Sequence, residues 1–77
     1  MLNLTNRQAD TLAQLIDEAV NATRAAAIDQ SARAAATRYL REYRLAEYHT
    51  TRHAQFVALA GELTAAAAAL RGRQPPP

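Results

Sequence analysis

Residues 6–27 read NRQADTLAQLIDEAVNATRAAA, and this stretch decides the fold class. It contains neither glycine nor proline, and the same is true of the whole chain from Met1 to Ala60. Alanine supplies 20 of the 77 residues. Because alanine is the strongest helix former and glycine and proline are the main helix breakers, the sequence predicts an all-α protein.

The first helix has a recognisable beginning. Thr5 and Gln8 have the spacing of a capping box, in which each side chain bonds the other residue's backbone N–H. Small and apolar residues then recur at alternating steps of three and four, at Ala9, Leu12, Ile16, Ala19, Thr23 and Ala26. This spacing is typical of the apolar face of an amphipathic helix, which we expect to extend from Asn6 to about Ala27.

Two later stretches resemble helix boundaries. Asp29 and Ser31 are good N-cap residues and predict a turn near residues 28–30, although Asp29 and Arg33 also suit an ion pair within one continuous helix. Thr50 and Thr51 interrupt the apolar pattern and predict a second boundary. Beyond it the apolar positions follow heptad spacing, at Phe56, Leu59, Leu63, Ala66 and Leu70.

The two glycines lie near the end of the chain. Gly61 costs about 1 kcal/mol relative to alanine inside a helix, so we expect it at a close crossing of two backbones. Gly72 suits a left-handed helix cap, and Pro75 prevents the helix from continuing. These signals predict a single helical domain, residues 1–71, followed by a proline-rich disordered tail, residues 72–77.

Two architectures fit these helices. One is a three-helix bundle, and the other is a helical hairpin whose short first helix packs on one long helix from about Gln30 to Leu70. In either case the core is thin, because alanine buries little area and the chain has no cysteine for a disulfide. We therefore expect dimerisation to complete the small helical bundle. The expected dimer interface consists of Leu12, Ile16, Phe56, Leu59, Leu63 and Leu70.

The segment 38–53 holds all three tyrosines, both histidines and four arginines. Arginine and tyrosine are enriched in protein-binding hot spots and also occur on nucleic-acid-binding surfaces. Tyr39 and Tyr43 are alternatively core residues, since they share one helix face. The candidate partner-binding residues are Arg38, Tyr39, Arg41, Tyr43, Arg44, Tyr48 and Arg52.

Other functions find little support in the residues. His49 and His53 have a zinc-chelating spacing, but a full ligand set is missing, so we expect no metal and no cofactor. The acids are scattered, and neither a catalytic arrangement nor a phosphate loop occurs, so we expect no enzyme. No apolar run approaches the roughly 20 residues of a membrane span, and a signal peptide is not evident. We expect a cytoplasmic protein without membrane contact.

The functional expectation is therefore a small non-enzymatic helical protein that acts by protein–protein binding. It would bind itself as a homodimer and bind an unidentified protein as a regulator, inhibitor or accessory factor. The alternative is a nucleic-acid-binding module that uses the arginine- and tyrosine-rich helix face. A net charge of +2 is a weak electrostatic basis for that alternative.

Overall fold

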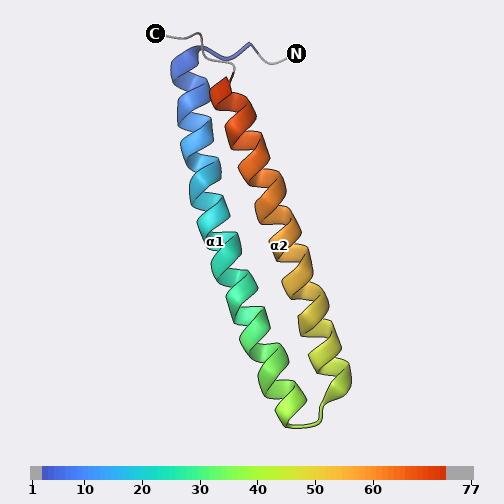
Figure 1. The fold of residues 1–77 in the computed structure, drawn as a ribbon. Coiled ribbons are helices and arrows are strands. Elements are labelled where there is room, and N and C mark those ends of the chain that lie inside the picture. The colour runs from blue at the N-terminus through green and yellow to red at the C-terminus, as the bar shows by residue number, and fades with distance from the viewer. Residues whose placement is uncertain (1–2, 73–77) are drawn as a thin grey trace.

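The computed structural model describes residues 3–72, which form two long helices. Helix α1 spans Asn6–Tyr39 and helix α2 spans Tyr43–Gly72. The helices lie side by side in opposite directions, so the start of α1 and the end of α2 lie at one end and the connecting loop lies at the other (Figure 1). The prediction of an all-α fold is confirmed, and the described chain is a hairpin of two helices of similar length.

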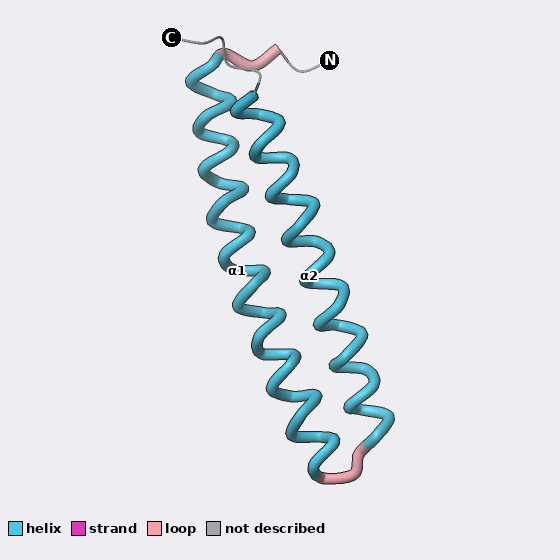
Figure 2. Tube along the Cα trace, viewed as in Figure 1, coloured by secondary structure: helices cyan, strands magenta, loops and turns pink. Residues whose placement is uncertain are grey.

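The hairpin is a rod. Its principal extents are 56 × 19 × 16 Å and its radius of gyration is 17.1 Å. A globular chain of this length would have a radius of gyration of about 11.5 Å. Figure 2 shows that the two helices run alongside each other for almost their whole length. The core is therefore confined to the narrow strip along which the helices touch.

Helix α1 begins as expected. The Thr5 hydroxyl accepts a hydrogen bond from the Gln8 backbone N–H at 3.1 Å, and the Thr5 backbone N–H donates to Gln8 Oε1 at 3.0 Å. Both halves of the capping box are present. The box satisfies two backbone N–H groups that would otherwise lack a partner at the helix start.

The turn predicted near residues 28–30 is wrong, because α1 continues through it. Asp29 accepts a hydrogen bond from Arg33 Nε at 2.8 Å, which is the ion pair expected of a continuous helix. The boundary predicted at Thr50 and Thr51 is also wrong. The Thr50 hydroxyl donates to the Ala46 carbonyl oxygen at 2.8 Å, so this side chain bonds backward into its own helix and caps nothing.

The chain turns at residues 40–42 instead. The Glu42 N–H bonds to the Thr37 carbonyl oxygen at 2.8 Å, and the Arg41 N–H bonds to the Arg38 carbonyl oxygen at 3.0 Å. This pair of bonds is a Schellman motif, which needs a left-handed residue just after the helix. Arg41 takes that conformation, with φ of 62°. The sequence does not predict this turn, because glycine, the usual residue at the left-handed position, is absent there.

The line of contact between the helices, which we call the seam, is made of small side chains. Buried residues recur every seven positions in α1 from Ala13, and in α2 the same repeat passes through the half-buried His53. The buried residues are Ala13, Val20, Ala27 and Ala34 in α1, and Ala46, Ala60 and Ala67 in α2, with Ala9 near the start. The seven-residue repeat is that of a coiled coil, here between antiparallel helices.

Alternate members of the apolar stripes predicted from the sequence lie one residue before this seam. Leu59 and Ala66 each precede a seam alanine in α2, and Leu12 and Ala19 precede seam residues in α1. Since successive residues on a helix diverge by about 100°, these side chains lie beside the seam and not in it. Other members of the stripes do line the seam and are half-buried, namely Ile16, Thr23, Phe56, Leu63 and Leu70.

Both glycine predictions are wrong. A Cβ atom built on Gly61 meets nothing within 4 Å, so no backbone crosses there. Gly72 is the last residue of α2 and lacks a positive φ, so it is not a left-handed cap. Residues 73–77, most of the predicted proline-rich tail, lie outside the described part of the chain.

Candidate functional site

The loop end of the rod carries a cluster of exposed large side chains. Tyr39 is 87% exposed, and Leu40, Tyr43 and Tyr48 are each more than half exposed. The alternative that Tyr39 and Tyr43 belong to the core is therefore wrong. Around them stand the exposed arginines Arg38, Arg41 and Arg44. We call the set Arg38, Tyr39, Leu40, Arg41, Tyr43, Arg44 and Tyr48 the loop-end surface.

Arg52, the remaining candidate partner-binding residue, lies apart from this surface. Its guanidinium carbon is 4.8 Å from the centre of the Phe56 ring, a cation–π arrangement within α2. The Arg52 Nε atom is buried and has no hydrogen-bond partner. Arg52 therefore packs along the rod, whereas the other six candidates gather at its tip.

The six residues of the expected dimer interface share one side of the hairpin. Four of them are half-buried residues of the seam, namely Ile16, Phe56, Leu63 and Leu70. The other two, Leu12 and Leu59, each come one position before a buried seam residue. Both kinds face the same flank. Leu15 joins them one helical turn from Leu12. We call Leu12, Leu15, Ile16, Phe56, Leu59, Leu63 and Leu70 the leucine flank. Leu12, Leu15 and Leu59 remain 37%, 56% and 42% exposed.

The opposite flank is more polar. In both helices, the residues that come four positions after a buried seam residue face this flank. Two contacts between the helices show this. Arg71 Nη2 donates to Asp17 Oδ2 at 2.5 Å, and Arg38 Nη2 donates to the Thr50 hydroxyl at 3.5 Å. Two exposed apolar side chains, Val57 (52% exposed) and Ile28 (71% exposed), also lie on this side beside Arg24. The two flanks therefore differ in chemistry although they border the same seam.

The ion pair on the polar flank shifts the ionisation of both partners. The hydrogen bond from Arg71 lowers the pKa of Asp17, and the same bond raises the pKa of Arg71. Both side chains remain nearly half exposed, so solvent screens the attraction between them. The pair links α1, about three turns after its start, to the last turn of α2.

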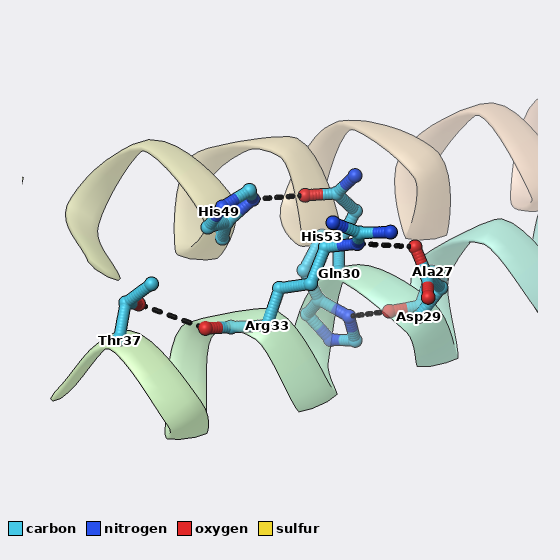
Figure 3. Close-up of polar contacts among 7 residues, drawn as sticks. All are labelled: Ala27, Asp29, Gln30, Arg33, Thr37, His49 and His53. Carbon is cyan, nitrogen blue, oxygen red and sulfur yellow. Dashed lines mark hydrogen bonds and ion pairs between the residues drawn. The ribbon is translucent and has the colours of Figure 1, made fainter. Parts of the chain in front are cut away.

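The two histidines bridge the helices across the seam (Figure 3). His49 Nδ1 lies 2.6 Å from Gln30 Oε1, and His53 Nδ1 lies 2.8 Å from the Ala27 carbonyl oxygen. A carbonyl oxygen can only accept, so the His53 ring donates from Nδ1. The seam thus changes from apolar packing to polar bridging near its middle.

These histidines have different hydrogen-bond partners and do not converge on a shared point. Within residues 3–72, no group of three or more His, Cys, Asp or Glu side chains is arranged to hold a metal ion. The zinc-like spacing of His49 and His53 is explained by the seam, where positions four apart on one helix both face the other helix.

Comparison with protein-family models, with curated proteins and with solved structures returns no match to this chain. Over the described range, neither helix is long and apolar enough to cross a membrane. The loop-end surface and the leucine flank are the two candidate functional surfaces of the described chain.

Proposed function

We propose that this protein is a small non-enzymatic binding protein whose working form is a homodimer paired through the leucine flank. The observation that carries the proposal is the placement of its large apolar side chains. Leu12, Leu15 and Leu59 lie exposed on one flank, together with the half-buried Ile16, Leu63 and Leu70. A second copy would remove this continuous apolar strip from water.

The composition of the seam supports the same conclusion. Among the described residues, the buried set consists of seven alanines and Val20, and no large side chain is fully buried. Burying a leucine contributes about 1.5–3 kcal/mol, and an alanine methyl group contributes much less. A chain this short is marginally stable even when it is globular, and this rod is not globular. Association through the leucine flank buries apolar area that a single copy leaves exposed to water.

The loop-end surface is the proposed site for a different protein. Its tyrosines offer large, rigid contact area, and its arginines suit an acidic protein surface. Arg41 adds to the argument, because a non-glycine residue in the left-handed region costs about 1–2 kcal/mol. Strain of this kind gathers at functional positions. We therefore expect the Arg41 side chain to be used in binding.

Light scattering tests the dimer with two matched variants. The wild-type protein is expected at about 17 kDa, twice the chain mass of 8.4 kDa. Leu59→Asp places a charge on the leucine flank and is expected to shift the mass toward 8.4 kDa. Val57→Asp, two residues away on the polar flank, is the control and should remain dimeric. Equal masses for the two variants would count against the leucine flank as the interface.

Pull-down from the native host, with wild-type protein and Arg44→Ala, tests the loop-end surface. Loss of a captured protein with the variant is the expected result. Nucleic acid is the other class of partner that arginine and tyrosine suit. Oligonucleotide binding that weakens steeply between 50 and 200 mM salt would assign the surface to nucleic acid instead.

A further inference from the structure

We infer that the two copies of the proposed homodimer lie antiparallel over their whole length, with Arg52 of each copy paired with the partner's Glu62. This inference rests on the proposed dimer and adds its geometry. The side of the rod that carries the leucine flank has leucines toward the loop as well. In α2, the residues just before successive seam positions are Leu45, Arg52, Leu59 and Ala66. Leu45 is 49% exposed and Leu59 is 42% exposed, so a second copy can cover both halves of the rod.

Arg52 interrupts this row of apolar residues. Its Nε atom is buried without a hydrogen-bond partner, and its guanidinium lies over the Phe56 ring. Glu62 lies on the same flank, because it directly precedes a half-buried seam residue, as Leu15 directly precedes Ile16. Within the described residues, neither Arg52 nor Glu62 takes part in an ion pair. They stand ten residues apart on one helix, about 15 Å, so they cannot pair with each other in one chain.

The two residues are placed symmetrically about the middle of the rod. Helix α2 spans Tyr43–Gly72, so its midpoint falls at position 57.5, and the midpoint between Arg52 and Glu62 falls at position 57. In a fully overlapped antiparallel pair the two-fold axis is perpendicular to the rods, so α2 lies on the partner's α2. Each residue then meets the one that is equally far beyond the midpoint. Arg52 therefore comes to the level of the partner's Glu62, within about 1.5 Å along the axis.

The same overlap places large side chains on small ones. Tyr48, which is 55% exposed, comes to the level of the partner's Ala66. Leu45 comes to the level of the partner's Ala69, an exposed residue on the same flank. In α1, Ala22 lies at the midpoint of the helix, and its small side chain allows the two α1 helices to approach closely. The two surfaces are therefore complementary in shape as well as in charge.

The charge along the rod favours the same arrangement. Residues 23–57, which form the loop half, contain six arginines and three acids, a net charge of +3. The terminal half, residues 3–22 and 58–72, contains two arginines and four acids, a net charge of −2. An antiparallel pair sets each positive half on a negative half, whereas a parallel pair sets like charges together.

The charged residues of α1 are compatible with this pairing. Leu12 and Leu15 come to the level of the partner's Arg33 and Asp29. These two charges already neutralise each other within one chain, with 2.8 Å between Arg33 Nε and Asp29 Oδ2. An arginine can also pack its aliphatic stem on a leucine while its guanidinium stays in water. No charge has to be buried without a partner in this arrangement.

The arrangement has a functional consequence. The two loop-end surfaces would stand at opposite ends of a four-helix rod and point away from each other. A single hairpin is 56 Å long, so the two surfaces would be separated by most of that length. One dimer could then hold two molecules of the partner protein without contact between them.

Charge reversal tests the ion pair. Arg52→Glu and Glu62→Arg each place like charges together at both copies of the contact, so each should raise the dimer Kd about tenfold. The double variant restores opposite charges and should dimerise more tightly than either single variant. Glu18→Arg is the control, because it makes the same change in charge on an exposed position away from the flank, and it should leave the Kd nearly unchanged. Sedimentation equilibrium measures the Kd, and circular dichroism verifies that each variant is helical.

A double variant that dimerises no better than the weaker single variant would overturn the inferred pairing while the proposed dimer stands. A wild-type protein with the mass of one chain would overturn the dimer and the pairing together.

Spin labels provide a second measurement that does not depend on charge, because the chain has no cysteine of its own. Ala22→Cys and Ala36→Cys are matched, since each replaces an exposed alanine on this flank that precedes a half-buried threonine. The inferred pairing predicts a separation within about 25 Å between labels at position 22 and about 40 Å between labels at position 36. A dimer with similar distances at both positions is parallel and would overturn the inference.

Discussion

His53 Nδ1 in α2 lies 2.8 Å from the backbone carbonyl oxygen of Ala27 in α1. A side chain reaches the backbone of the facing helix only where the side chains between them are small. Ala27 and Ala60, the next buried residue of α2, meet this condition, since both are nearly fully buried. The alanine seam therefore sets how closely the two helices approach, and larger seam residues would force them apart.

Enlarging a seam alanine is the first test of this packing. Ala60→Leu inserts three carbon atoms at a position that is 3% exposed, and we expect it to lower the free energy of unfolding by about 1–3 kcal/mol. Ala58→Leu is the control, because Ala58 is exposed and leucine is also a good helix former. Urea unfolding at one fixed protein concentration measures both. If Ala60→Leu and Ala58→Leu are equally stable, the seam has room for a larger side chain and is not closely packed.

Gly61 gives a prediction of opposite sign. A Cβ atom at this position meets nothing within 4 Å, so Gly61→Ala should raise the free energy of unfolding by about 1 kcal/mol through helix propensity alone. Ala54→Gly, on the same face of α2 one heptad earlier, should lower it by a similar amount. Thermal unfolding followed by circular dichroism compares the three proteins. A loss of stability in Gly61→Ala would show that something packs against this position.

Arg41 occupies the left-handed position of the turn, where glycine has no steric cost. Arg41→Gly should raise the free energy of unfolding by about 0.5–1 kcal/mol, after allowance for the extra freedom of glycine in the unfolded chain. Arg41→Ala also removes the guanidinium but keeps the Cβ atom, so it should bring no gain. Chemical denaturation separates the two variants. If both stabilise equally, charge repulsion at the loop end and not backbone strain is the cause.

The Asp17–Arg71 pair predicts a dependence of stability on pH. Because the pKa of Asp17 is lowered in the folded protein, the pair's contribution is fully present above the unfolded pKa of about 3.9. It is lost as the pH falls through the lowered pKa. Asp17→Asn should remove this part of the pH dependence. Carboxyl NMR titration is the direct measurement, and an Asp17 that titrates at or above the ordinary value would contradict the contact.

The sequence predicts some of this structure well, for identifiable reasons. The absence of helix breakers before Gly61 predicts the helices, and Thr5 with Gln8 predicts where α1 begins. The turn is missed because Arg41 occupies a position where glycine is the usual signal, and because Asp29 and Thr50 resemble caps. No local pattern distinguishes a cap from a side chain that bonds within a continuous helix.

The candidate surfaces are predicted only in part. Leucine is more apolar than alanine, so the hydrophobic pattern predicts Leu12 and Leu59 as core residues in place of Ala13 and Ala60. The repeat of alanine every seven residues, interrupted by Val20 and His53, is the signal in the sequence that indicates the seam. The arginine- and tyrosine-rich composition of the segment 38–53 makes Tyr39 a candidate partner-binding residue, but the exposure of its side chain depends on the position of the turn. The bridge from Gln30 to His49 depends on the pairing of two helices and has no signal in either one.

The concentration dependence of thermal unfolding tests the central claim, that a second copy completes this rod, most directly. For a folded dimer in equilibrium with unfolded chains, the midpoint temperature rises with protein concentration. With an unfolding enthalpy of about 0.7 kcal/mol per residue over two chains, the expected rise is roughly 5 °C for each tenfold increase. Melts from 1 to 100 µM should therefore differ by about 10 °C. A cooperative midpoint that stays constant over this range would contradict the account.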